Sequence, residues 1–405
     1  MNVRHLVIQP DNRLHDSTQT YLIKNTSNNQ YIRLGKNETY HLLSVLGAND
    51  AAEELNLHGV EEIPDELREI LLNKFSEWGF LNENIKEIKT NTLEKLKKIR
   101  LIKFNVQKML QVIYPLYSVF FSKAGLISLI CMTAAVMGYF YICLATVSAA
   151  YYAEAPVVNL RFSVWEAALI FLFFLFNTFL HEFAHAVTCV KYGGKVTSMG
   201  LMLFYLIPCF YCDVSSVYTF QNRMHRAIVA VSGILANLFI GNILLIIAIA
   251  LSYWNIIIIL LFYMAVSTII VSLYNLVPFV KLDGYWLLQA LTGMDNLMDK
   301  SVILAYTTIF ARKYLKDINI DPTKRRLLSA YGIISLFFHQ LFWIYSYFTI
   351  KSIINLDGAW GNAITVIVAA VIILDFIKTL QYYYRIIRND YHRMIMTIDA
   401  GRNNC

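Results

Sequence analysis

The motif HEFAH at residues 181–185 combines the residue types that hold and use a catalytic metal ion. His181 and His185 are four residues apart, so on an α-helix both imidazoles project from one face and can bind one ion. Glu182 lies beside that face, where its carboxylate can take a proton from an attacking water molecule. The alternative is a polar cluster that packs one helix against another. Such polar groups are costly beside apolar sequence, so we interpret the motif as a metal site.

A zinc hydrolase site normally has three protein ligands. Asp283, in the segment YNLVPFVKLDGYWLLQALTG, is the best candidate for the third. Pro278 interrupts the preceding helix and Gly284 lets the chain turn, which can direct the Asp283 carboxylate back toward the histidines. An aspartate here is also a good N-cap for a helix over residues 285–291, and it can serve both purposes.

Other residues around this motif have more than one interpretation. Asn275 could donate a hydrogen bond to an oxyanion at the metal, and packing between helices is an equal alternative. Asn177 lies four residues before His181 on the same helical stripe, where it can support that histidine or pack against a neighbouring helix. The small residues within 233–237 favour close helix packing near the site.

The composition indicates a membrane protein. Of the 405 residues, 57% are hydrophobic and only 16% are charged, whereas a soluble chain carries about 25% charged residues. Apolar stretches of roughly 20 residues are typical of transmembrane helices. We expect an all-α polytopic membrane domain, because lipid offers no partner for exposed backbone groups. The expected spans are residues 122–149, 163–190, 226–251, 255–277, 327–349 and 361–380.

The basic residues orient these spans. The loops on one side contain only two basic residues, Arg161 and Lys351. These loops are residues 151–162, 252–254 and 350–360. By the positive-inside rule, the other side faces the cytoplasm and carries both termini. The net charge of +7 is explained by this distribution, and we expect no nucleic-acid partner.

Residues 1–85 are polar and predict a small soluble domain. A hairpin followed by small helices indicates a winged-helix-like α+β module. The strands are expected at residues 20–24 and 30–34, and the helices at residues 37–46 and 64–78.

Two further segments lie outside the spanning helices. The basic residues 86–115 predict a linker or a helix lying on an anionic membrane surface. Residues 195–220 alternate turns with apolar runs, so we expect a re-entrant β-hairpin whose edge could pair with an extended peptide. Asp213 is expected to stabilise this segment rather than bind metal. The membrane domain then covers residues 116–390 and a cytoplasmic tail covers residues 391–405.

Over residues 160–295 the chain resembles the site-2 protease family of intramembrane zinc metalloproteases. That family pairs HExxH on one membrane helix with a later NP…LDG-type motif that supplies the third ligand, and NLVPFVKLDG is the counterpart here. Family members from peptide-natural-product clusters also show NPxxKxDGYxLL and FYxDVS, which CFYCDVSSVYTF resembles. The chain departs from the pattern at Asn275 and Pro278, which are separated by two residues instead of being adjacent.

Residues 1–85 resemble the PqqD-like domains that bind leader peptides during ribosomal-peptide maturation. The matching pieces are YLIKN…QYIRLGKNETYHLLSVLG and ELREILLNKFSEWGFL. Together the resemblances imply a multi-pass zinc metalloendopeptidase of a bacterial cell membrane. Its substrate would be a membrane-associated or ribosomally made precursor peptide, with the leader held by residues 1–85. A structural cap or dimerisation module is the alternative for this domain.

Two other functions stay open. Regulated cleavage of a transmembrane signalling protein, such as an anti-sigma factor, keeps the enzyme and changes the substrate. A non-catalytic membrane zinc protein, acting in immunity, sensing or metal transport, belongs to another class. A transporter should carry ionisable residues at successive depths in the membrane, whereas here they cluster at one depth. The sequence determines neither the substrate nor the oligomeric state.

Overall fold

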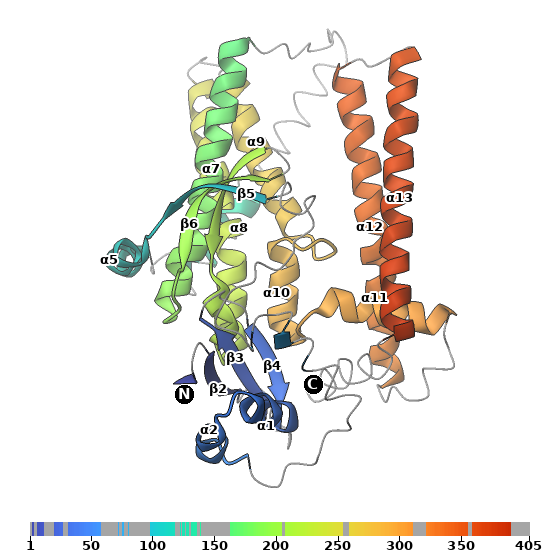
Figure 1. Cartoon of the computed structure of the whole chain (residues 1–405). Coiled ribbons are helices and arrows are strands. Elements are labelled where there is room, and N and C mark those ends of the chain that lie inside the picture. Colours follow the sequence, from blue (N-terminus) through green and yellow to red (C-terminus); the bar gives the residue numbers. More distant parts are fainter. Residues whose placement is uncertain are drawn as a thin grey trace. The chain divides into compact units, whose positions relative to one another are not determined.

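The computed structural model describes residues 2–3, 6–11, 20–26, 31–57, 98–117, 163–204, 207–253, 259–310, 321–354 and 359–389, with isolated positions within 72–80 and 122–138. Helices dominate this part of the chain, and the strands form two small antiparallel sheets (Figure 1). The chain divides into two compact units, Met1–Asn275 and Leu276–Cys405.

The N-terminal sheet has the strand order β1-β2-β3-β4, so β4 is an edge strand among the described residues. The pairing of β3 with β4 confirms the predicted hairpin. Helix α1 follows β4 directly and ends just before Gly47, whose φ of 66° is a conformation that favours glycine. The elements are β1 (Asn2–Val3), β2 (Leu6–Asp11), β3 (Thr20–Asn25), β4 (Tyr31–Gly35), α1 (Lys36–Val45) and α2 (Asn49–Glu54).

This sheet and its helices share one apolar core. Ile23 of β3 and Leu42 and Leu43 of α1 are fully buried in it. Their burial explains why an otherwise polar segment folds, because these side chains leave water together. The helix predicted at residues 64–78 lies almost entirely outside the described residues.

A second sheet joins two distant parts of the first unit. Residues 198–213 form the expected hairpin, with β6 (Ser198–Phe204) paired to β7 (Ile207–Asp213). Residues 98–104, expected to belong to a linker or an interfacial helix, instead form strand β5 (Lys98–Phe104), which pairs with β6. The reason is visible in KIRLIKF, where basic and apolar residues partly alternate as in a strand. Helix α5 (Gln107–Tyr117) follows β5.

The described part of the first unit also contains three long helices, α7 (Val164–Lys191), α8 (Arg223–Tyr253) and α9 (Ile259–Asn275). Helix α7 begins with a capping box, in which Ser163 accepts a hydrogen bond from the Glu166 backbone and the Glu166 carboxylate accepts one from the Ser163 backbone. Helix α8 packs on both α7 and α9. The short 3-10 helix η1 (Ser215–Thr219) connects the hairpin to α8.

The second unit contains α10 (Asp283–Thr292), α11 (Leu297–Phe310), α12 (Pro322–Ile354) and α13 (Ala359–Asn389). Helix α10 ends at Gly293, whose φ of 71° terminates it in the left-handed conformation. Helix α11 packs closely on α12, and both contact α13.

Four helices of the described residues are long and apolar enough to cross a membrane. They are Val164–Lys191, Arg223–Leu251, Pro322–Tyr345 and Gly361–Arg385, which overlap four of the predicted spans. The predicted span 255–277 appears as a shorter apolar helix, Leu260–Asn275. The predicted span 122–149 lies mostly outside the described residues, so six spans and the orientation of the termini stay predictions. Large apolar side chains such as Leu172 and Val366 are exposed on these helices, as expected for surfaces that face lipid.

Candidate metal centre

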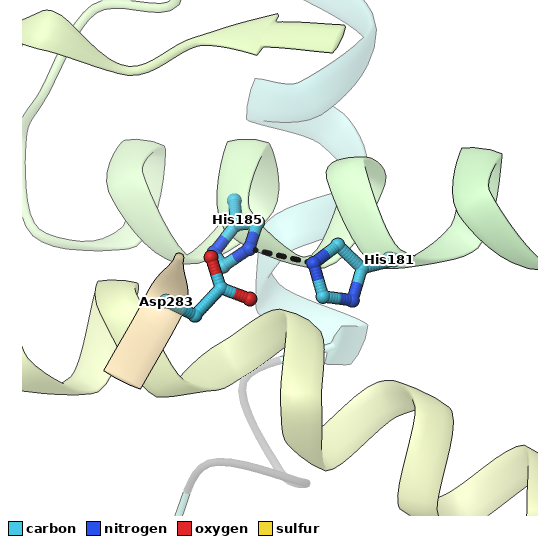
Figure 2. A group of neighbouring side chains, drawn as sticks. All are labelled: His181, His185 and Asp283. Carbon is cyan, nitrogen blue, oxygen red and sulfur yellow. Dashed lines mark hydrogen bonds between the residues drawn. The ribbon is translucent and has the colours of Figure 1, made fainter. Parts of the chain in front are cut away.

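Helix α7 places two buried imidazoles on one face, one turn apart. The Nε2 atoms of His181 and His185 lie 3.2 Å from each other (Figure 2). Two nitrogens that bind the same tetrahedral zinc ion, each at a distance of about 2.05 Å, lie about 3.3 Å apart. The separation therefore suits a shared ion, and a direct hydrogen bond between the two rings is the other arrangement that it permits.

Helix α8 determines which nitrogen of His185 is available. The Nδ1 atom of His185 lies 2.7 Å from the carbonyl oxygen of Val229, which can only accept a hydrogen bond. The proton of a neutral imidazole is therefore on Nδ1, and Nε2 keeps its lone pair. The hydroxyl of Ser232 donates to the same carbonyl, at 2.8 Å. This is the usual support for a metal-binding histidine.

Gly233 has no side chain, which lets the backbone of α8 lie close to both imidazoles. A Cβ at this position would lie 2.4 Å from Nε2 of His185 and 2.7 Å from Nε2 of His181. Val229, Ser232 and Gly233 follow the helical spacing that puts them on one side of α8. That side of α8 thus supplies a hydrogen-bond acceptor to His185 and a backbone without a side chain beside both rings, and the ring nitrogens there suit a cation. The close packing expected at residues 233–237 is confirmed at Gly233.

Asp283 completes a group that could hold a metal ion. One ligand atom from each of His181, His185 and Asp283 lies within 4.8 Å of the others (Figure 2). It is the one group of three or more histidine, cysteine or acidic side chains with such spacing that the described residues contain. Two imidazole nitrogens and a carboxylate oxygen are a donor set that zinc accepts. Helix α10 starts at Asp283 itself, so this residue occupies the first turn instead of the expected N-cap position.

The predicted base, Glu182, follows His181 on α7 and is partly buried. Burial raises the pKa of the Cys212 thiol on β7, and the charge of Glu182 adds to that rise. Glu182 is therefore an electrostatic neighbour of the hairpin, although its catalytic role stays a prediction.

The two asparagines differ in their surroundings. Asn177 is buried one turn before His181, and its Oδ1 accepts no hydrogen bond from any described residue. Asn275 is the last residue of α9 and is partly buried. Their roles, as support for His181 and as oxyanion donor, also stay predictions.

The hairpin packs, through aromatic side chains, on the part of α7 that carries His181 and His185. The ring centroid of Phe179 lies 5.8 Å from that of Phe183, one turn along α7, and 5.2 Å from that of Phe210 on β7. Strand β7 has one partner, β6, among the described strands, so no described strand pairs with its other edge. An extended chain could add to that edge beside the histidines.

Asp213 ends β7 and stabilises the hairpin, as expected. Its carboxylate accepts hydrogen bonds from the Thr197 hydroxyl and from the Ser215 backbone and hydroxyl. Burial alone would raise its pKa, but these hydrogen bonds and the positive charge of Arg100 outweigh burial and lower the pKa. Asp213 is not part of the metal group.

One curated protein resembles part of the chain. It is the "Putative peptide zinc metalloprotease protein YydH" of Bacillus subtilis (strain 168), which is 29% identical over 129 residues. The match covers 32% of this chain and 49% of YydH, so it spans about half of that relative. No family model and no solved structure matches the chain. The name of this relative agrees with the metalloprotease kind of activity that the histidine motif predicts.

Proposed function

We propose that this protein is an intramembrane zinc metallopeptidase that hydrolyses a peptide bond in a membrane-associated or ribosomally made precursor peptide. The observation that carries the proposal is the group of His181, His185 and Asp283, whose ligand atoms lie within 4.8 Å of one another. The similarity to YydH supports the metalloprotease activity, and the four long apolar helices support the membrane setting.

His181, His185 and Asp283 hold the metal in this proposal, and His185 is ready to bind because Val229 fixes its tautomer. A bound zinc ion supplies a Lewis acid, which polarises the scissile carbonyl and makes a water molecule a better nucleophile near neutral pH. Glu182 accepts the proton of the attacking water and returns it to the leaving amine.

Asn275 and Asn177 would assist the proposed hydrolysis. Asn275 donates a hydrogen bond to the developing oxyanion, and Asn177 holds His181 in position. The position of Asn177 on the same stripe of α7, one turn before His181, supports its part of the proposal.

The substrate binds in extended form. A peptide bond inside a helix is shielded by the helix backbone and side chains, so cleavage needs an unwound segment. The open edge of β7 provides backbone groups for such a segment, and the packing of Phe210 on Phe179 keeps this strand beside the metal-binding turn of α7.

Residues 1–85 hold the leader of the precursor peptide. The edge strand β4 offers a second row of backbone groups to an extended chain. Its first residue, Tyr31, has its ring centroid 6.1 Å from that of Tyr218 in η1, the element that directly follows the hairpin. Since both residues lie in the first unit, a leader on β4 would be close to the segment that presents the scissile bond.

The test compares the wild-type protein with Glu182→Gln, both purified in detergent. Precursor peptides from neighbouring genes are incubated with each protein, products are identified by mass spectrometry, and bound zinc is measured. We expect Glu182→Gln to keep its zinc and to cleave slower by a factor of about 10² to 10⁴, because a general base is lost.

Equal cleavage by Glu182→Gln would show that Glu182 is not the base. Cleavage by metal-stripped wild-type protein would refute the zinc mechanism. Cleavage of a single-span membrane anchor, with precursor peptides left intact, would favour the regulated cleavage of a signalling protein. Zinc binding without cleavage of either substrate would favour a non-catalytic zinc protein.

A further inference from the structure

The third ligand of the proposed metal site follows an irregular segment. Residues 276–282 lie between α9 and α10 and adopt turns and bends. Such a segment has many conformations when nothing holds it, and each of them moves Asp283. A carboxylate that must meet two imidazoles within bonding distance therefore needs a support for this loop.

Helix α12 holds the first half of the loop. The hydroxyl of Tyr331 donates a hydrogen bond of 2.6 Å to the carbonyl oxygen of Pro278. The ring of Phe279 packs against two rings of α12, with centroid distances of 5.7 Å to Tyr331 and 5.6 Å to Phe338. These contacts fix the loop four to five residues before Asp283.

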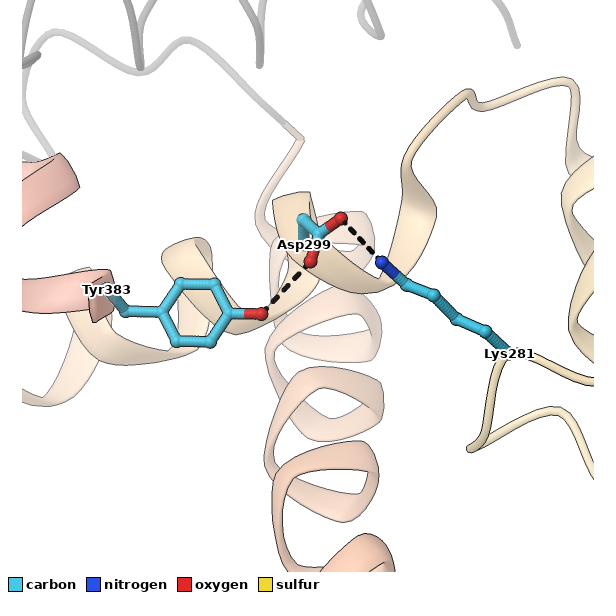
Figure 3. A network of polar contacts seen from close by, with 3 residues as sticks. All are labelled: Lys281, Asp299 and Tyr383. Atoms are coloured by element: carbon cyan, nitrogen blue, oxygen red, sulfur yellow. Dashed lines mark hydrogen bonds and ion pairs between the residues drawn. The ribbon is translucent and has the colours of Figure 1, made fainter. Parts of the chain in front are cut away.

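A polar network holds the second half. Lys281, two residues before Asp283, forms an ion pair of 3.1 Å between its Nζ and Oδ2 of Asp299 (Figure 3). The hydroxyl of Tyr383 on α13 donates to the other carboxylate oxygen, Oδ1, at 3.0 Å. Asp299 lies in the first turn of α11, where a negative charge is favourable. Both oxygens of Asp299 are thus engaged, and its orientation is fixed.

The helices that carry these anchors are in close contact with each other. A Cβ at Gly332 of α12 would lie 2.2 Å from the carbonyl oxygen of Ser301 on α11, so the two backbones nearly touch. Tyr331 and Asp299 are neighbours of these contact points in the sequence. The two anchors of the loop therefore belong to one packed frame.

The ion pair is a weak source of overall stability. The side chains of Lys281 and Asp299 are 50% and 38% exposed, and pairs this exposed contribute little to the free energy of unfolding. A surface pair without any role would be the simpler explanation. Two features favour a local role: Asp299 is held by a second hydrogen bond, and Lys281 stands two residues from the proposed ligand.

We propose that Lys281, Asp299 and Tyr383 form a clamp that positions Asp283 for metal binding. None of the three binds the metal; they act through the backbone of the loop. This inference rests on the proposed metal site, in which Asp283 is the third ligand and these three residues hold it in position.

The experiment measures zinc affinity and the zinc dissociation rate of full-length variants in detergent, by competition with a chromogenic chelator. Lys281→Met and Asp299→Asn should each bind zinc about 10-fold more weakly, as residues that support ligands typically do. Tyr383→Phe should weaken binding less, and Lys281→Arg should bind as the wild type does because it keeps the pair. The double variant Lys281→Met with Asp299→Asn should be no weaker than either single variant, since both changes break one interaction.

Three controls make the result decisive. Lys324→Met removes the same charge from the exposed first turn of α12 and should leave zinc binding unchanged. Thermal unfolding in excess chelator should be alike for all variants, because the clamp contributes little to stability. His181→Ala calibrates the assay, since it removes a proposed ligand and should lose zinc.

The possible failures are distinguishable. If His181→Ala keeps wild-type zinc affinity, the proposed metal site itself is wrong. If His181→Ala loses zinc while Lys281→Met and Asp299→Asn bind it as tightly as the wild type, the clamp is wrong and the proposed function stands. Equal weakening by Lys324→Met would also overturn the clamp, because the effect would then be one of net charge.

Discussion

A β-carbon on Gly233 would stand 2.4 Å from Nε2 of His185, closer than side-chain carbons approach such atoms. The backbone of α8 therefore forms one wall of the proposed metal site, and a glycine at this point is a requirement of the site and not only of helix packing.

Gly233→Ala should weaken zinc binding by at least about 10-fold, because the new methyl group displaces either α8 or the two imidazoles. Zinc affinity by chelator competition measures this. Gly241→Ala is the matched control: on the same helix its Cβ would crowd Ile269, at 2.7 Å, away from the histidines. It should lower the melting temperature without changing zinc affinity. Similar zinc affinities for Gly233→Ala and Gly241→Ala would contradict the assignment of the wall.

Asp213→Asn should destabilise the protein at neutral pH and lose that effect in acid. The pKa of Asp213 is lowered in the folded protein, so the charged carboxylate stabilises the fold above its unfolded pKa, near 3.8. This contribution disappears as the pH falls below about 4 and through the lowered folded pKa. Melting temperatures of the wild type and Asp213→Asn between pH 7 and pH 3 should therefore converge toward the acid end. A constant difference across this range would show that the charge is not the cause.

Gly200→Val should abolish cleavage while zinc stays bound. A Cβ on Gly200 would lie 1.9 Å from the carbonyl oxygen of Ile102, so a side chain there must separate β6 from β5. Loss of β5 removes the support of the hairpin that we propose presents the substrate. Leu201→Val, on the same strand, is the control and should cleave normally. Full activity of Gly200→Val would mean that the pairing of β5 with β6 is dispensable.

Deleting residues 1–85 should raise KM for a leader-bearing peptide by about 10-fold or more and leave KM for the leaderless core unchanged. The reason is that a tethered leader site raises the local concentration of the scissile segment. Steady-state cleavage assays with the two peptides check this. If the deletion affects both peptides equally, the domain supports the fold and does not deliver a leader.

The candidate site was predictable because its signals are local. His181 and His185 owe their common face to helical spacing alone, and the apolar length of α7 made the helix certain. The prediction of Asp283 as a ligand needed several signals. Pro278 and Gly284 indicate a helix break and a turn, and the resemblance of the LDG segment to the site-2 protease motif suggests a ligand. One ligand atom of each of the three residues lies within 4.8 Å of the others, and metal binding by Asp283 stays a prediction.

Other parts depend on partners far away in the chain. Strand β5 was missed because its basic residues suggested a membrane surface, while its partner β6 lies about a hundred residues later. The contacts of Asp299 with Lys281 and Tyr383 join a loop and two helices through side chains that follow no periodic pattern. The tautomer of His185 depends on the carbonyl of Val229, and a carbonyl is present at every residue, so no residue type indicates it.

The capped start of α7 at Ser163 puts both histidines in the half of that helix that ends at Lys191. His185 is six residues from Lys191, or about 9 Å along the axis, and 21 residues from Val164, or about 32 Å. In the proposed function, a scissile bond that reaches the histidines thus lies closer to the Lys191 end of α7 than to its Val164 end. For the proposed function, this position favours a cut near the end of a substrate helix, where only its terminal turns must unwind.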